Sequence, residues 1–113
     1  MRLYRAKVPE IARHVIETLC NDGDIEVAME NRTEAEQDLV AIMEEYLRRD
    51  WQLREKVREE MAQSGVGYEN YGKMRGKLAD RWGHPTRDDV GRYLSRQFIE
   101  NFMISHFVDE VFT

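Results

Sequence analysis

The longest uninterrupted pattern of apolar and polar positions runs over residues 33–63, a stretch without proline or glycine. Apolar side chains recur along it three, four or seven residues apart, which places them on one face of an α-helix. These residues are Leu39, Met43, Tyr46, Leu53, Val57 and Met61. At 1.5 Å per residue the helix extends roughly 45 Å, longer than a domain of this size is wide. We therefore predict a helix that packs along other helices, projects beyond the core or pairs with another chain.

The apolar face of this long helix is broad in its first half and narrow in its second. The first half carries Leu39, Val40, Ile42, Met43, Tyr46 and Leu47, whereas Leu53, Val57 and Met61 stand alone among charged residues in the second. A broad face indicates a globular end, and a thin seam is typical of a coiled-coil-like end. Asp50 interrupts the seam, and Trp51 lies to one side of it. Thr33 and Glu36 have the spacing of a capping box, which predicts the start of the helix.

Two shorter elements are predicted before the long helix. Residues 8–20 carry an apolar stripe, with Pro9 in the first turn and Gly23 shortly after the end, as is typical of an α-helix. Residues 25–30 alternate apolar and charged side chains, the period of a half-buried strand. A lone strand leaves backbone groups unpaired. We expect it to pair with the N-terminal segment, the C-terminal segment or the same strand of a second copy.

Two further helices are predicted after a flexible break at residues 64–67. The first carries an apolar stripe of Tyr71, Met74, Leu78 and Trp82 and ends at residues 83–85. The second begins at Thr86, followed by acidic residues suited to a helix start. All four phenylalanines lie in the last sixteen residues, where apolar side chains cover most of the helix circumference. This arrangement predicts a helix buried on nearly all sides, in the core or in an interface.

The patterns together predict a mostly α-helical single domain over residues 1–113. We expect a helical bundle or hairpin built on one long helix (about 33–63), with at most one short strand near 25–30. A hydrophobic share of 42% with 35% charged residues is typical of a helix-rich globular protein. No run of apolar residues is long enough for a membrane span, so we expect no membrane partner. Cys20, the only cysteine, excludes an internal disulfide and fits a cytoplasmic protein.

No catalytic or cofactor motif stands out in the chain. His14 with Glu17, and His106 with Asp109, share helical faces, but the order His-x-x-acid differs from the Glu-x-x-His of di-metal bundles. Residues 67–73 read Gly-x-x-x-x-Gly-Lys, but methionine follows where a phosphate-binding loop needs serine or threonine. We therefore expect no enzyme activity, no metal and no other cofactor.

The charge distribution offers a candidate polyanion-binding segment. The net charge of −5 weighs against general nucleic-acid affinity. A basic stretch nevertheless lies near Tyr71 and Trp82, and its members are Lys73, Arg75, Lys77 and Arg81. They are either contacts for nucleic acid or another polyanion, or the solvated face of a helix whose apolar stripe is buried. An acidic protein surface, including residues 22–38 of another copy, is an equally natural target.

Parts of the chain resemble a known family. The residues concerned are Met1-Arg2-Leu3, the helix through Ile11, Ala12, Val15, Ile16 and Leu19, then Asp22-Gly23-Asp24-Ile25-Glu26-Val27, Arg48-Arg49-Asp50 and Lys56-Val57-Arg58. They resemble the small bacterial family catalogued as domain of unknown function 507. The likeness covers about the first two thirds of the chain. The family has no established activity, so the resemblance implies no functional residues, and it points to a bacterial, intracellular protein.

We interpret the chain as a non-catalytic module for protein interaction or self-association, acting as a homodimer or on a partner protein. The candidate interface consists of Trp51, Leu53, Val57, Met61, Phe107 and Phe112, with Trp51 as an anchor because tryptophan is enriched in binding hot spots. The alternative for the seam is an intramolecular hairpin with residues 71–82. The alternative function is association with nucleic acid through residues 73–87.

Overall fold

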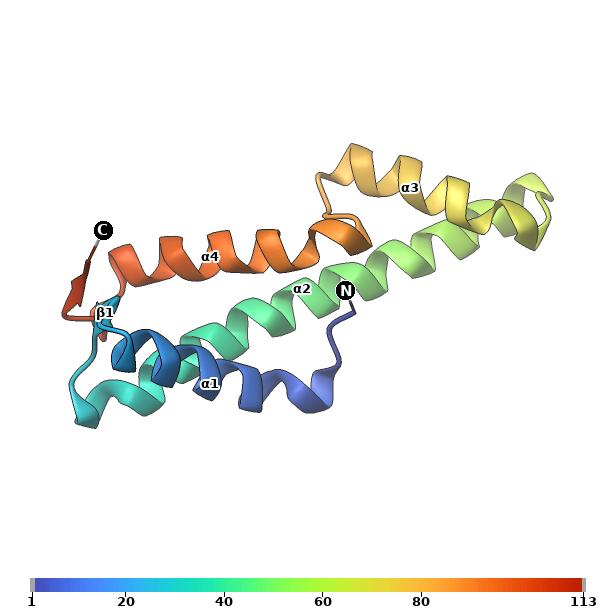
Figure 1. Ribbon diagram of the computed structural model, residues 1–113. Helices are drawn as coiled ribbons and strands as arrows, with labels where there is room; N and C mark the ends of the chain where they lie inside the picture. The colour runs from blue at the N-terminus through green and yellow to red at the C-terminus, as the bar shows by residue number, and fades with distance from the viewer. Residues whose placement is uncertain (1, 113) are drawn as a thin grey trace.

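The protein is organised along one central helix, α2 (Arg32–Ser64), as the computed structural model of residues 2–112 shows (Figure 1). Met1, part of the family resemblance, and Thr113 lie outside the described residues. The molecule is elongated, with extents of 55 × 26 × 21 Å. The predicted mostly α-helical fold is confirmed. The helix begins just after Asn31 without a side-chain capping bond, so the capping-box prediction is wrong.

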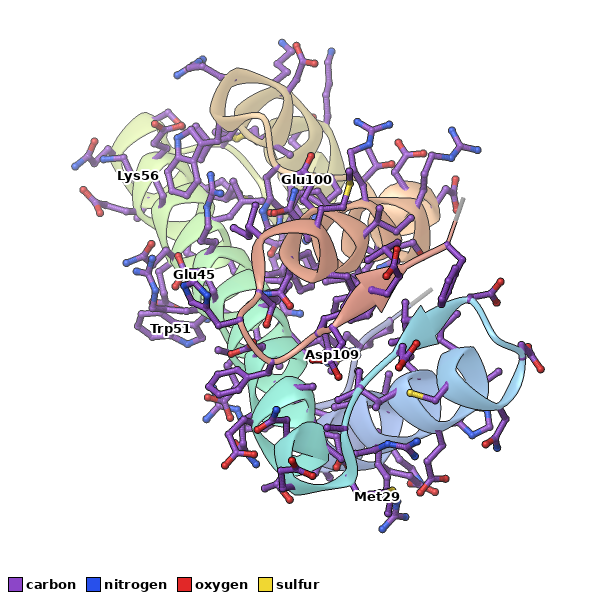
Figure 2. All side chains as sticks on the ribbon, turned by 90° about the vertical axis from the view of Figure 1, so that its left-hand side faces the viewer. Met29, Glu45, Trp51, Lys56, Glu100 and Asp109 are labelled. Atoms are coloured by element: carbon purple, nitrogen blue, oxygen red, sulfur yellow. The ribbon has the colours of Figure 1, made fainter. Side chains whose placement is uncertain are left out.

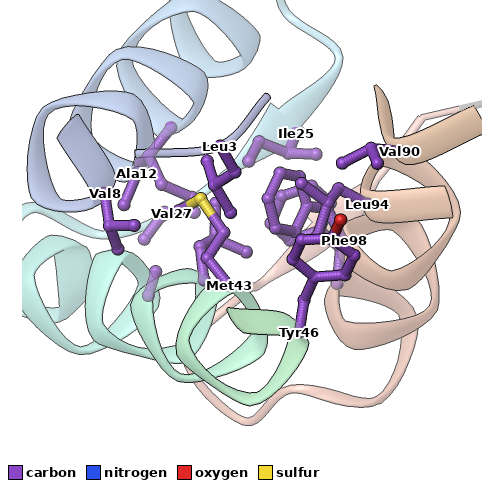
Figure 3. Packing of buried hydrophobic residues seen from close by; sticks show 14 residues of the cluster. Leu3, Val8, Ala12, Ile25, Val27, Met43, Tyr46, Val90, Leu94 and Phe98 are labelled. Carbon is purple, nitrogen blue, oxygen red and sulfur yellow. The ribbon is translucent and has the colours of Figure 1, made fainter. Parts of the chain in front are cut away.

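Three helices form a bundle at one end of the molecule. Helices α1 (Val8–Asn21) and α4 (Val90–Ile104) both lie along the first half of α2 (Figure 1). Buried side chains from all three helices meet in the main core, including Ala12, Met43 and Phe98 (Figure 3). Leu3, just before the 3-10 turn Arg5–Lys7, is buried in the same core and anchors the N-terminal segment. The broad apolar half of α2 thus forms the globular end, as predicted.

The second half of α2 forms a hairpin with α3 (Tyr71–Trp82) (Figure 1). Gly65 ends α2 with a φ of +69°, a left-handed conformation that glycine adopts without strain. The chain then reverses through another 3-10 turn, Tyr68–Asn70. The seam residues pack in one separate core, formed by Leu53, Val57, Met61, Leu78 and Ala79. Of the two interpretations of the seam, the structure shows the intramolecular hairpin.

The predicted strand pairs with the C-terminal segment. Strand β1 (Ile25–Glu26) lies antiparallel to β2 (Glu110–Val111), with Ile25 opposite Val111. The Asp109 amide donates to the Glu26 carbonyl at 2.8 Å, which extends the pairing. The strand is shorter than expected because Met29–Asn31 form a 3-10 turn leading into α2.

The last helix differs from its prediction in length and in burial. It begins at Val90, after the 3-10 turn Arg87–Asp89, and ends at Ile104. Phe98 and Phe102 are buried, but three other apolar side chains of its last turns, Ile99, Met103 and Ile104, are exposed. The prediction of burial on nearly all sides is wrong, because α4 packs through one face and nothing in residues 2–112 covers the other. No helix in the described part of the chain is both long and apolar enough to cross a bilayer.

Candidate anion-binding groove

A buried carboxylate, Asp50, lies between the two cores. Asp50 is 6% exposed, and one of its partners, His84, is 5% exposed. His84 Nε2 lies 3.0 Å from Asp50 Oδ1, and an Arg75 guanidinium nitrogen lies 2.6 Å from the same oxygen. Arg54, one turn along α2, lies 3.0 Å from the other oxygen, Oδ2. Asp50 therefore joins α2, α3 and the segment after α3 in one polar cluster.

The partners of Asp50 keep its carboxylate charged. Burial by itself would raise the pKa of Asp50, but the hydrogen bond from His84 and the charges of Arg75 and Arg54 outweigh it. The pKa of Asp50 therefore lies below its ordinary value. An ionised carboxylate only accepts hydrogen bonds, so Nε2 of His84 carries the donated proton.

Backbone geometry after α3 places His84 in this cluster. Gly83 ends α3 with a φ of +67°, and the His84 amide donates to the Ala79 carbonyl at 2.9 Å. This is the Schellman pattern of helix ends, and it turns His84 inward. The Tyr46 ring stacks on the imidazole, with centroids 5.1 Å apart and planes 8° apart. Burial, reinforced by the charge of Asp50, raises the pKa of the Tyr46 hydroxyl, so Tyr46 stays neutral.

An open groove of about 570 Å³ lies beside this cluster, between the N-terminal segment and the middle of α2. Leu3 is held in the main core, so its neighbours Arg2, Tyr4 and Arg5 line one wall. The other wall comes from α2 and consists of Leu47, Arg48, Asp50, Trp51 and Arg54. We call this the arginine–tryptophan groove. Trp51 is 61% exposed and projects from the side of α2 that faces away from α1 and α4 (Figure 2).

The arginine–tryptophan groove is positively charged within an acidic protein. Four arginines line it, and Asp50 is the one carboxylate among the described residues that does. Arg48 is held by Glu45, whose Oε2 accepts a hydrogen bond from Nε at 2.9 Å. That bond lowers the pKa of Glu45. Arg2 lies over the Tyr4 ring, 5.2 Å from its centroid. Clustered guanidinium groups beside exposed rings attract and orient carboxylates or phosphates.

The basic segment of α3 is divided by the fold. Lys73, Lys77 and Arg81 are exposed on the outer side of α3, whereas Arg75 turns inward to Asp50. The predicted set of four is therefore not one surface, because the charge of Arg75 is engaged by a buried carboxylate. The other three remain a candidate polyanion surface.

The residues of the candidate interface are separated as well. Leu53, Val57 and Met61 are buried against α3, and Trp51 lies on the exposed side. Phe107 is partly buried against the main core, while Phe112 is 52% exposed at the end of the chain. His14 and His106 are exposed and far from one another in the sequence. Within residues 2–112, no three histidine, cysteine or acidic side chains gather closely enough to hold a metal ion.

Sequence reasoning missed both His84 and the arginines of the groove. One signal was present, because Asp50 occupies a position in the apolar seam that a hydrophobic residue would normally fill. A buried acid requires partners, but nothing in the sequence indicates which of the seventeen lysines and arginines supply them. Arg5 and Trp51 are more than forty positions apart, so only the fold brings them together.

Comparison with known proteins identifies a family but no activity. Searches of curated proteins and of solved structures give no match. The sequence model of one family, described as "Protein of unknown function (DUF507)", matches residues 1–113. The match includes the phenylalanine-rich C-terminal third, beyond the first two thirds of the chain that carry the resemblance. The chain therefore belongs to the DUF507 family.

Proposed function

We propose that this protein is a non-catalytic interaction module whose arginine–tryptophan groove binds a short acidic segment of a partner protein. One observation carries the proposal: an exposed tryptophan lies among four arginines in a chain whose net charge is −5. Tryptophan, tyrosine and arginine are the residues enriched at binding hot spots. The proposal places the protein in the cytoplasm, where the free thiol of Cys20 is compatible with the reducing conditions.

The size and charge of the groove favour a protein segment over a long polyanion. Asp50 already engages Arg54, and Glu45 engages Arg48, which leaves Arg2 and Arg5 as the less neutralised cations. Such a groove suits a peptide segment that places one or two carboxylates beside these arginines and packs an apolar side chain on Trp51. A nucleic-acid strand extends beyond the groove, where the net negative charge of the chain opposes its phosphates.

The proposal is tested with a fluorescein-labelled peptide of glutamates that carries one central phenylalanine. We expect saturable binding by fluorescence anisotropy at low salt, weakening as salt is added. Arg5→Glu should raise Kd about five-fold, which corresponds to about 1 kcal/mol. Trp51→Ala should raise it about thirty-fold, as expected for a hot-spot anchor. Both side chains are exposed, so the melting temperature should stay unchanged.

Arg13→Glu is the matched control for Arg5→Glu. It makes the same change of charge at an exposed position of α1, outside the residues that line the groove. We expect its Kd to stay within two-fold of the wild-type value. Equal weakening by both variants would show that net charge rather than the groove attracts the peptide, and it would refute the proposal.

The exposed basic residues of α3 support a second candidate function, which is binding of single-stranded nucleic acid. Lys73, Lys77 and Arg81 lie along one exposed side of the helix, so they can follow a phosphate backbone. A labelled oligothymidylate distinguishes the two functions in the same assay. Binding that is lost in Lys73→Glu/Lys77→Glu but retained in Arg5→Glu would favour this candidate. Failure of the oligonucleotide to bind would exclude it.

A further inference from the structure

A second groove, apolar in character, separates α1 from α4. It encloses about 340 Å³, and its apolar walls are formed by Val15, Leu19, Phe98, Ile99 and Phe102. No acidic side chain, lysine or arginine of the described residues lines it. Both helices pack on α2 and lie on the opposite side of it from Trp51 (Figure 2). Occupation of this apolar groove is therefore independent of the arginine–tryptophan groove.

An apolar ridge lies directly beside this groove. Ile99 is 54% exposed and Met103, one turn further along α4, is 68% exposed. Ile99 belongs to both features, because it also lines the groove. The same face of α4 therefore offers a hollow and a projection side by side. A surface of this kind is complementary to itself, which is the requirement for an interface between identical chains related by a twofold axis.

The charges next to the ridge fit the same arrangement. Arg96 and Glu100 are exposed, one turn apart on α4, and neither makes an ion pair within residues 2–112. Two α4 helices can pair antiparallel about a twofold axis that passes midway between Arg96 and Glu100. Arg96 of each copy then faces Glu100 of the other copy. A parallel pairing would place like charges together, which opposes association.

We propose that a second copy of this chain docks on the face formed by α1 and α4. The α4 helices run antiparallel, and the Ile99 and Met103 ridge of each copy enters the apolar groove of the other. Burial of these exposed apolar side chains supplies the attraction. The reciprocal pairs between Arg96 and Glu100 fix the direction and register of the two helices.

The test is sedimentation velocity of the full chain over a range of concentrations reaching about 100 µM. We expect the wild type to form a dimer in this range. Ile99→Arg should raise the dimer Kd at least thirty-fold, the effect of losing a hot spot. At concentrations low enough for both proteins to be monomeric, the melting temperature should be unchanged, because Ile99 is exposed. Met29→Arg alters another exposed apolar side chain, in the 3-10 turn before α2 and outside the residues that line the groove, and should leave Kd unchanged.

A charge exchange tests the antiparallel register separately. Arg96→Glu alone and Glu100→Arg alone should each weaken the dimer several-fold, because each sets like charges opposite one another. The double variant Arg96→Glu/Glu100→Arg should restore the wild-type Kd. A monomeric wild type, an unaffected Ile99→Arg dimer, or additive losses in the double variant would each overturn the proposal.

Discussion

Replacing Asp50 with alanine is expected to lower the free energy of unfolding by about 3–5 kcal/mol. Asp50 is buried, and its two oxygens accept from His84, Arg75 and Arg54. Its removal leaves the buried His84 imidazole without its acceptor. It also leaves the neighbouring charges of Arg54 and Arg75 without a counterion. Chemical denaturation monitored by circular dichroism measures the loss.

Asp80→Ala is the control for this experiment. Asp80 is an exposed acid of α3, so its removal changes the net charge equally without opening the polar cluster. We expect an effect within about 0.5 kcal/mol. A loss below about 1 kcal/mol for Asp50→Ala would contradict the role of Asp50 in joining the two cores.

The contribution of Asp50 is also expected to depend on pH in a defined direction. Its pKa in the folded protein is lower than the ordinary value of about 3.9. A group with a depressed folded pKa stabilises the folded state fully above its unfolded pKa, and this stabilisation is lost as the pH falls through the folded pKa. The stability difference between wild type and Asp50→Asn should be constant near neutral pH and should shrink below about pH 4. A difference that grows on acidification would contradict this sign.

Replacing Val57 with aspartate is expected to open the hairpin of α2 and α3. Val57 is fully buried in the second core, beside Leu53 and Leu78. A carboxylate at this position has no partner, and an unpaired buried charge costs several kcal/mol. We expect a loss of more than about 3 kcal/mol, with a lower helical content. Circular dichroism, melting temperature and native mass are measured together.

Arg58→Asp is the matched control for Val57→Asp. It places the same side chain one position further along α2, where the residue is exposed and pairs with Glu55 at 2.8 Å. Breaking this exposed pair should cost no more than about 0.5 kcal/mol. A folded Val57→Asp protein with an unchanged melting temperature would show that the seam does not hold the hairpin. A dimer converted to a folded monomer would instead assign the seam to an intermolecular interface.

The helices of this protein could be predicted because their signals are local. The helical spacing of apolar residues indicates one buried face, and it does so without information about the partner segment. This spacing is seen in Leu39, Met43 and Tyr46, and again in Leu53 and Val57. The change from a broad face to a thin seam also indicated a globular end and a coiled-coil-like end, which the structure shows to be a three-helix bundle and a two-helix hairpin. The last helix was predicted less well, because a run rich in apolar residues does not show which of its faces finds a partner.

The candidate sites depend on contacts between distant parts of the chain. Asp50 and His84 are 34 positions apart, and their approach requires both the turn at Gly65 and the helix end at Gly83. The arginine–tryptophan groove requires Leu3 to be held in the core, so that Arg2 and Arg5 lie beside Trp51. Arg75 turns inward to Asp50, so it is not part of the exposed basic surface of α3 that the sequence predicted.

The sequence alone determined the helical class, the long central helix and its two unlike halves, because side-chain periodicity records burial locally. The tertiary structure alone decided that the seam closes within one chain, that β1 pairs with β2 and that arginines gather around Asp50 and Trp51. Each of these depends on which distant segments meet. Many pairings satisfy the same local pattern, and the packing of the whole chain selects one.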